Sequence, residues 1–300
     1  MTDHPHSIDV VLALGGGAAR GVAHIGILQV LAERGIRVRG IAGTSIGAII
    51  GGMYAADCMK PLVEYLLKLD ARRMLRLLDP VVPRSGLLGG SRVVDKMTDF
   101  AGDAQIEDLE LPFVAVAADL RSGQEVLLRE GSLVEAVRAS FAIPGVFTPV
   151  QIGGRWLVDG GISSPVPIRA ARLLCPDLPV VAVDLNNVDM VFEGEVLCSL
   201  DAPEEERELG RIERLLRRMR GDEEKRPGML ASISDAVTHM EHRLARFQIA
   251  ADEPELLLEP PVYGIGLFDF HRSASIIEAG RRCAEQALHA DAVHALARHG

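Results

Sequence analysis

The feature that most constrains this sequence is the pentapeptide Gly-Thr-Ser-Ile-Gly at residues 43–47. Alternating apolar and polar residues at 36–42 predict a short strand before it, and the small apolar residues 46–56 predict a buried helix after it. A serine on so sharp a turn needs neighbours without a Cβ atom, which explains Gly43 and Gly47. The free N–H groups at the helix start would face negative charge forming at the Ser45 hydroxyl. The pattern indicates either a nucleophilic serine or a glycine-rich turn with a capping serine.

A second glycine-rich turn, Gly15–Gly21, follows a predicted buried strand at residues 8–14 and precedes a predicted helix at 22–34. Free backbone N–H groups in such a turn can bind an anion. Dinucleotide binding is disfavoured, because the glycine spacing is one residue too long and residues 40–42 carry no acid. An oxyanion hole is the favoured interpretation, since two strand-to-helix turns on adjacent parallel strands would meet at one end of the sheet.

An acidic residue, Asp159, follows a short predicted strand at 155–158 and is followed by Gly160 and Gly161. Such a sequence is usually a turn, and from these residues alone a turn is favoured. The functional interpretation is a carboxylate held at the rim of the sheet, with glycines that let other backbone approach it.

Strands and helices alternate over residues 8–190, which predicts a mostly parallel sheet with helices on both faces. We expect a single domain over 1–300, with a core at about 8–190 and C-terminal helices at 227–290 that pack on it. The stretch 193–226 is a charged helical insertion whose helix is either a solvated surface helix or an amphipathic one that touches lipid or covers the site. Further expected elements are helices at 59–78, 91–100 (capped by Ser91), 132–140, 165–174, 228–250 and 273–289, a loop at 141–149, and strands at 112–118, 124–128, 180–185 and 256–258.

The composition excludes several classes of function. A formal net charge of -10 makes a nucleic-acid partner unlikely. The four cysteines have no metal-ligand spacing, so we expect no zinc, no disulfide framework and a reducing cytoplasm. The longest apolar run, 41–56, is shorter than the ~20 residues that span a bilayer. We expect a cytoplasmic protein that is soluble or peripheral to a membrane, and the oligomeric state stays open.

Three motifs together resemble the patatin-like phospholipases, in the bacterial branch near the neuropathy target esterases: Gly15–Gly21, Gly43–Gly47 and Asp159-Gly160-Gly161. Each motif is weak alone, but their order and spacing make the set strong. The resemblance continues through residues 139–147, 164–167, 268–272 and 277–280. It departs at Ala18, where many members have another glycine, although the backbone N–H is retained.

The resemblance implies a three-layer α/β/α sandwich and a catalytic dyad without histidine, in which Ser45 is the nucleophile and Asp159 activates it. It implies oxyanion donors at Gly16, Gly17 and Ala18, with Arg20 steadying the loop or the charge. The implied reaction hydrolyses an acyl ester of a phospholipid or lysophospholipid, without cofactor, metal or calcium.

Two alternatives stay open. One is a Ser-His-Asp esterase, for which His271 is the best placed of three histidines that follow the acid, the others being His239 and His242. The other is a lipid-binding regulatory module without activity.

Overall fold

The structure is a computed structural model, and it describes residues 8–77, 79–81, 86–186, 229–289, 292–293 and 296–297. The expected charged insertion at 193–226 lies outside these residues.

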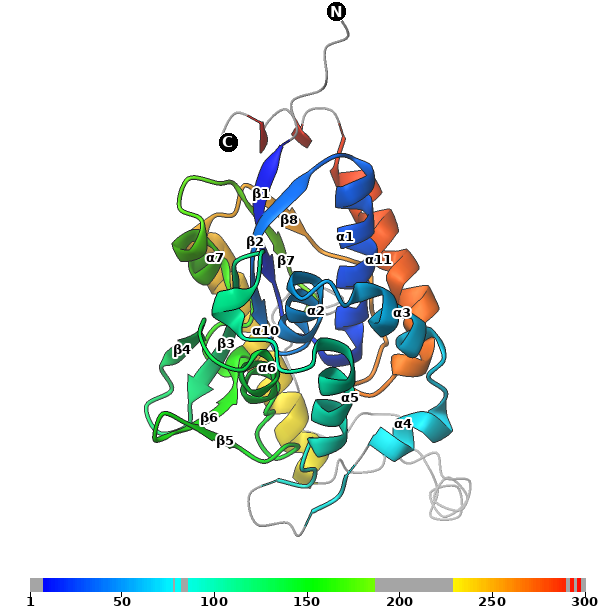
Figure 1. Cartoon of the computed structure of the whole chain (residues 1–300), viewed down its shortest axis with the longest axis vertical. Helices are drawn as coiled ribbons and strands as arrows, with labels where there is room; N and C mark the ends of the chain where they lie inside the picture. The colour runs from blue at the N-terminus through cyan, green and yellow to red at the C-terminus, as the bar shows by residue number, and fades with distance from the viewer. Residues whose placement is uncertain are drawn as a thin grey trace, which may run out of the picture.

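A mixed, mostly parallel sheet forms the centre of the molecule (Figure 1). In the described part of the chain it has the strand order β5-β6-β3-β2-β1-β7-β8, with β4 paired to β3. Strands β3, β2, β1, β7 and β8 are parallel, whereas β4 and β6 run antiparallel to β3 and β5 runs antiparallel to β6. The strands are β1 Asp9–Leu14, β2 Arg37–Thr44, β3 Phe113–Asp119, β4 Glu125–Leu128, β5 Val150–Ile152, β6 Arg155–Asp159, β7 Val180–Val183 and β8 Leu256–Leu258.

Helices cover both faces of the sheet, as expected. Strand β1 shows why, because alternate residues point to opposite faces: Leu12 and Leu14 pack in one apolar cluster, and Val11 and Ala13 pack in the other. The first cluster includes residues of α1 Ala23–Glu33, α2 Ile46–Ala55 and α11 Ser273–Ala287. The second includes residues of α7 Ile168–Leu174 and α10 Met229–Asp252. The result is a three-layer α/β/α arrangement.

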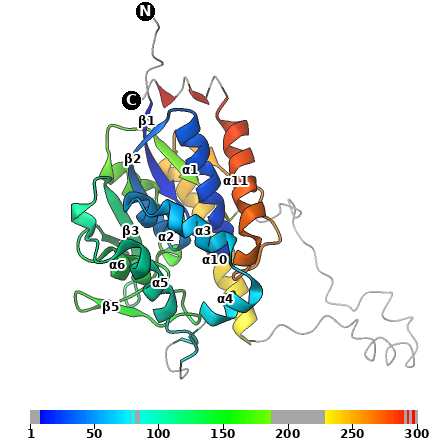
Figure 2. The ribbon, with the colours of Figure 1, turned by 45° about the vertical axis from the view of Figure 1, so that its right-hand side comes forward.

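The last long helix packs along the first one, so α1 and α11 lie side by side (Figure 2). Two glycines permit this close approach. A Cβ on Gly280 would lie 2.0 Å from the Ala23 carbonyl oxygen, and a Cβ on Gly26 would lie 2.0 Å from the Ile277 carbonyl oxygen. The C-terminal region is thereby fixed to the helix that follows the glycine-rich turn.

The elements expected between α2 and β3 need correction. The single helix expected at 59–78 is two helices, α3 Met59–Leu67 and α4 Ala71–Leu77. They separate because the Asp70 carboxylate accepts the Arg73 N–H at 2.7 Å, as a residue before a new helix does. Helix α5 Ser91–Ala101 forms as expected, but Ser91 does not cap it.

The Asp79 carboxylate takes over that role, accepting the N–H groups of Gly90 and Ser91 at 2.7 Å each. Helix α6 Leu133–Ser140 begins after Ser132, as expected. The loop after α6 leads into a short strand, β5, that the sequence did not predict.

Candidate active site

Ser45 stands on a sharp turn between β2 and α2. Its backbone has φ 56° and ψ -120°, a conformation that L residues with a side chain rarely adopt and that is typically strained. Gly47 makes the turn possible, because a Cβ there would lie 2.1 Å from the Leu14 carbonyl oxygen. The turn therefore holds the serine at the carboxyl end of the sheet, between the ends of β1 and β2.

The Ser45 hydroxyl and the Asp159 carboxylate are in direct contact. Ser45 Oγ donates to Asp159 Oδ2 at 2.6 Å, and Asp159 Oδ1 accepts the Gly161 N–H at 2.8 Å. The two side chains are 6% and 3% exposed, so bulk water hardly competes for this hydrogen bond. Strands β3 and β6 bring the acid to the serine: Thr44 pairs with Val116 in β3, and Asp159 pairs with the next β3 residue, Ala117.

Burial makes Asp159 a better base than a free aspartate. It raises the pKa of Asp159 to about 6, and the hydrogen bonds from Ser45 and Gly161 oppose that rise. A carboxylate with a pKa closer to neutrality accepts a proton more readily, yet it is still mainly ionised at pH 7.

The glycine-rich turn after β1 presents backbone amides next to Ser45, but not all those expected. The Gly16 N–H donates to the Pro165 carbonyl at 2.9 Å, so it is already engaged. Among the described residues, the N–H groups of Gly17 and Ala18 have no acceptor. Ala18 has φ 52°, an unusual value for alanine, and it lines both cavities that include Ser45, which are described below. The oxyanion hole hypothesis is thus narrowed to Gly17 and Ala18.

Two side chains hold this turn in place through its backbone carbonyl groups. Arg20 Nε donates to the Gly17 carbonyl at 3.1 Å, and His24 Nε2 lies 2.9 Å from the Gly15 carbonyl oxygen. His24 is fully buried, and burial lowers its pKa to about 4, so the ring is neutral and donates Nε2–H to that carbonyl. His24 therefore supports the glycine-rich turn, and it forms no hydrogen bond with the Ser45 hydroxyl.

Ser140, to which sequence reasoning gave no role, holds the serine turn. Its hydroxyl accepts the backbone N–H of Ser45 at 2.9 Å and donates to the Val116 carbonyl at 2.6 Å. Thr44 adds a second brace, since its hydroxyl donates to the Ser164 carbonyl at 2.7 Å. Ser140 lies 95 residues from Ser45 in the chain, and Ser164 lies 120 residues from Thr44, so no local pattern could reveal these contacts.

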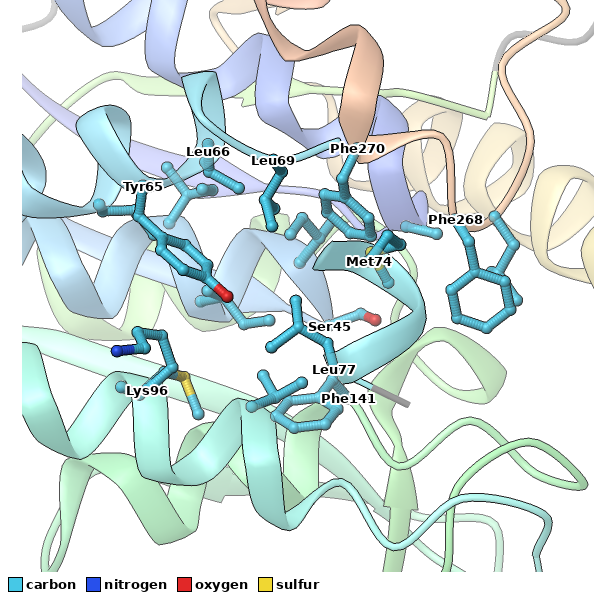
Figure 3. A pocket seen from close by; sticks show the side chains of 18 of the residues that line it. Ser45, Tyr65, Leu66, Leu69, Met74, Leu77, Lys96, Phe141, Phe268 and Phe270 are labelled. Atoms are coloured by element: carbon cyan, nitrogen blue, oxygen red, sulfur yellow. The ribbon is translucent and has the colours of Figure 1, made fainter. Parts of the chain in front are cut away.

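An apolar cavity opens on one side of Ser45 (Figure 3). Its empty volume, including the part open to solvent, is about 960 Å³. Side chains from α2, α3, α4 and α5 line it, together with the loops 141–147 and 267–270. They include Ile49, Tyr65, Leu66, Leu69, Met97, Phe141, Phe147 and Phe270.

Phe141 and Phe147 form one wall of this cavity and contact each other and Arg138. The rings contact edge to face at 5.3 Å, and the Arg138 guanidinium lies 5.1 Å and 5.7 Å from their centroids. Arg138 Nη2 also donates to the carbonyls of Gly89 and Thr148, at 2.7 and 2.8 Å. The guanidinium thus ties the rings to two loops.

A second, more polar cavity also reaches Ser45. Arg20, Asp159, Asn186, Thr238 and Glu241 line it, along with backbone of the glycine-rich turn. The two cavities share four residues: Ala18, Ser45, Ile143 and Leu267. A substrate with one apolar and one polar half could therefore span Ser45.

The histidines of the triad alternative do not join the site. His271 and His239 are exposed and line neither cavity, and His242 faces the Asp184 carboxylate. The Ser45 hydroxyl donates directly to a carboxylate, which favours the dyad. No group of three potential metal ligands occurs among the described residues, and no helix of that part of the chain is long and apolar enough to cross a membrane.

Comparison with known proteins identifies the family to which this chain is related. Residues 12–172 match the family described as patatin-like phospholipase. A Mycobacterium bovis protein, named as an uncharacterized NTE family protein, is 34% identical over 330 residues, covering 94% of this chain and 91% of the relative. Mouse patatin-like phospholipase domain-containing protein 6 is 34% identical over 186 residues, which cover 60% of this chain and 14% of that protein.

The fold agrees with this assignment. The crystal structure of VipD from Legionella pneumophila has a TM-score of 0.51 at 13% identity, covering 98% of this chain and 67% of that one. Both the match to the family and the similarity to full-length relatives show that the chain belongs to the patatin-like phospholipases, a family whose membership indicates lipid acyl hydrolase activity.

Proposed function

We propose that this protein is a serine hydrolase that cleaves carboxylic esters of phospholipids or lysophospholipids with a Ser45–Asp159 dyad. The observation that carries the proposal is the 2.6 Å hydrogen bond from Ser45 Oγ to Asp159 Oδ2 on a strained turn beside two free backbone amides. A serine hydroxyl is a weak nucleophile near neutral pH, and it needs an adjacent base of this kind.

The reaction would proceed in two halves. Asp159 takes the Ser45 proton as Oγ attacks the ester carbonyl, and the N–H groups of Gly17 and Ala18 bind the oxyanion that forms. The intermediate collapses, the bond from carbon to the alcohol oxygen breaks, and Asp159 passes its proton to the leaving alcohol. Water then attacks the acyl-enzyme, gives a proton to Asp159, and the fatty acid leaves as the proton returns to Ser45.

The two cavities support a lipid substrate. The apolar cavity suits an acyl chain, because burying it removes hydrocarbon from water at about 0.8 kcal/mol per CH₂ group. The polar cavity suits the alcohol half of the ester. We also infer that the protein meets its substrate at a membrane surface peripherally, in the cytoplasm.

The test begins with labelling by a fluorophosphonate probe and a hydrolysis screen of phospholipids, lysophospholipids and short esters. Ser45→Ala should abolish both labelling and hydrolysis, and Asp159→Asn should abolish hydrolysis. Ile49→Trp, which narrows the apolar cavity, should reduce activity on long acyl chains more than on short ones. Ser45→Ala with normal activity would end the proposal, and a folded wild type without labelling would favour a lipid-binding module.

A further inference from the structure

One acidic side chain of the polar cavity is not used by the dyad. Glu241 lies on α10, over 80 residues beyond Asp159, and it lines this cavity together with Ser45, Asp159 and the glycine-rich turn. Its Oε1 atom lies 2.7 Å from the point where a Cβ on Gly161 would stand. The carboxyl group therefore packs against the residue whose N–H holds Asp159 in place.

We propose that Glu241 is a second acidic residue of the site, whose protonated carboxyl group donates a hydrogen bond to the oxygen of the leaving alcohol. This rests on the proposed ester hydrolysis. The alcohol half of the substrate would occupy the polar cavity, where a protonated Glu241 offers a hydrogen-bond donor. A carboxylic acid kept neutral by its surroundings is a known way to supply such a donor.

The surroundings of Glu241 favour its neutral form. Burial raises the pKa of Glu241 to about 8, the negative charge of Asp159 adds to the rise, and the Arg20 cation opposes it. Asp159 keeps the single negative charge, because it accepts two hydrogen bonds, whereas no hydrogen bond reaches the Glu241 carboxyl within the described part of the chain. At neutral pH one carboxylate and one carboxylic acid share the site.

The other charged groups near Glu241 come from three other segments and from α10 itself. They are Arg20 from the turn after β1, Asp159 at the end of β6, Asp184 after β7, and His242 and Arg246 on α10 itself. The last two act on Asp184, not on Glu241. Arg169, on the packed helix α7, is exposed. Among these groups, Asp159 and Arg20 are the ones whose charges act on the Glu241 carboxyl.

The chemistry needs no proton from Glu241. As the bond between the acyl carbon and the alcohol oxygen breaks, Asp159 delivers the proton taken from Ser45, and Glu241 keeps its own while it stabilises the developing negative charge. An ionised Glu241 would lose the donor and add a like charge beside that oxygen. The protonated form of Glu241 should therefore be the active one.

The experiment compares kcat/KM across pH for wild type, Glu241→Gln and Glu241→Leu, on an alkyl ester followed by acid titration. The wild-type rate should fall about tenfold one pH unit above the pKa of Glu241. Glu241→Gln keeps an N–H donor that cannot ionise, so its ratio of rates at high and neutral pH should stay near one. Glu241→Leu has no donor, and it should lose about tenfold or more on the alkyl ester.

A nitrophenyl ester provides the matched comparison, because its leaving group needs little help. The loss in Glu241→Leu should be several-fold smaller on this ester, which a merely structural effect would not produce. An alkaline fall in Glu241→Gln equal to that of wild type would overturn the proposal, and so would equal losses on both esters. If Glu241→Leu does not fold, the pH dependence of kcat/KM in the near-isosteric Glu241→Gln still tests the proposal. Failure of ester hydrolysis itself is recognised separately, by an unchanged rate in Ser45→Ala.

Discussion

Asp159→Asn should abolish activity and at the same time stabilise the folded protein. The Asp159 side chain is 3% exposed, and its burial disfavours the charged form on which catalysis would depend. Asparagine has almost the same shape but no charge to bury. Its amide oxygen can still accept one of the two hydrogen bonds that the carboxylate accepts now.

The magnitude follows from the pKa of this one group. Between an unfolded pKa of 3.8 and a folded pKa of about 6, the folded state binds more protons than the unfolded state. The free energy of unfolding therefore falls as pH rises through that window, by about 3 kcal/mol in all, and the penalty is constant above it. Because the new NH₂ group must find its own partners, we expect a net gain of about 1–2 kcal/mol, or about 2–6 °C in Tm.

The assay is thermal unfolding of wild type and Asp159→Asn from pH 4 to pH 8, beside ester hydrolysis. The difference in Tm should grow between pH 4 and pH 6, since groups that the Asp159 charge does not influence cancel in the comparison. Glu241 does not cancel, because the Asp159 charge helps to raise its pKa, so the same pair is also compared in a Glu241→Gln background, where the difference should level off above pH 6. Asp119→Asn is the matched control of opposite sign. Hydrogen bonds from the Ser122 and Arg121 N–H groups help to lower the pKa of Asp119, so its replacement should destabilise the protein.

Two results would refute this reasoning. A variant less stable than wild type at pH 7 would show that the ionised carboxylate is stabilised in its site, contrary to the effect assigned to burial. A variant with near-normal turnover would remove Asp159 from the reaction.

Three further substitutions test the supports of the site. Ser140→Ala removes the acceptor of the buried Ser45 N–H, and it should cost about 1–3 kcal/mol of stability and lower kcat, measured by denaturant unfolding and ester hydrolysis. Gly280→Ala places a Cβ 2.0 Å from the Ala23 carbonyl oxygen, and it should lower the free energy of unfolding by about 1–3 kcal/mol. Ala18→Gly relieves a φ of 52° while keeping the backbone N–H, and it should raise stability by up to about 1 kcal/mol without loss of hydrolysis.

Controls make these outcomes decisive. Glu278→Ala, at an exposed position on α11, should leave stability nearly unchanged beside Gly280→Ala. A Gly280→Ala variant as stable as wild type would contradict the close helix contact. Unchanged turnover in Ser140→Ala would contradict its role in holding Ser45, and a fall in stability in Ala18→Gly would contradict the strain assigned to alanine there.

The sequence predicted the sheet and the serine turn because these depend on local patterns. The continuous apolar run of β1 and the glycines around Ser45 are such patterns. The resemblance to a family supplied the pairing of Ser45 with Asp159, which spacing alone left as a probable turn.

Other parts of the site depend on contacts between distant segments, and no pattern encodes them locally. The Gly16 amide is engaged because the Pro165 carbonyl packs against it. Ser140 reaches Ser45 only after β3 has been placed beside β2. In the sequence, Glu241 is only one of several charged residues on a predicted amphipathic helix. The packing of α10 brings it to the cavity.

The meeting of the two cavities at Ser45 has a consequence for the order of events. On the proposed mechanism, the alcohol can depart on one side while the fatty chain, still bonded to Ser45, remains seated on the other. The vacated side then admits water, or a second alcohol in its place. Acyl transfer between alcohols thus requires no rearrangement of the protein, and the partition between hydrolysis and transfer is set by which nucleophile enters first.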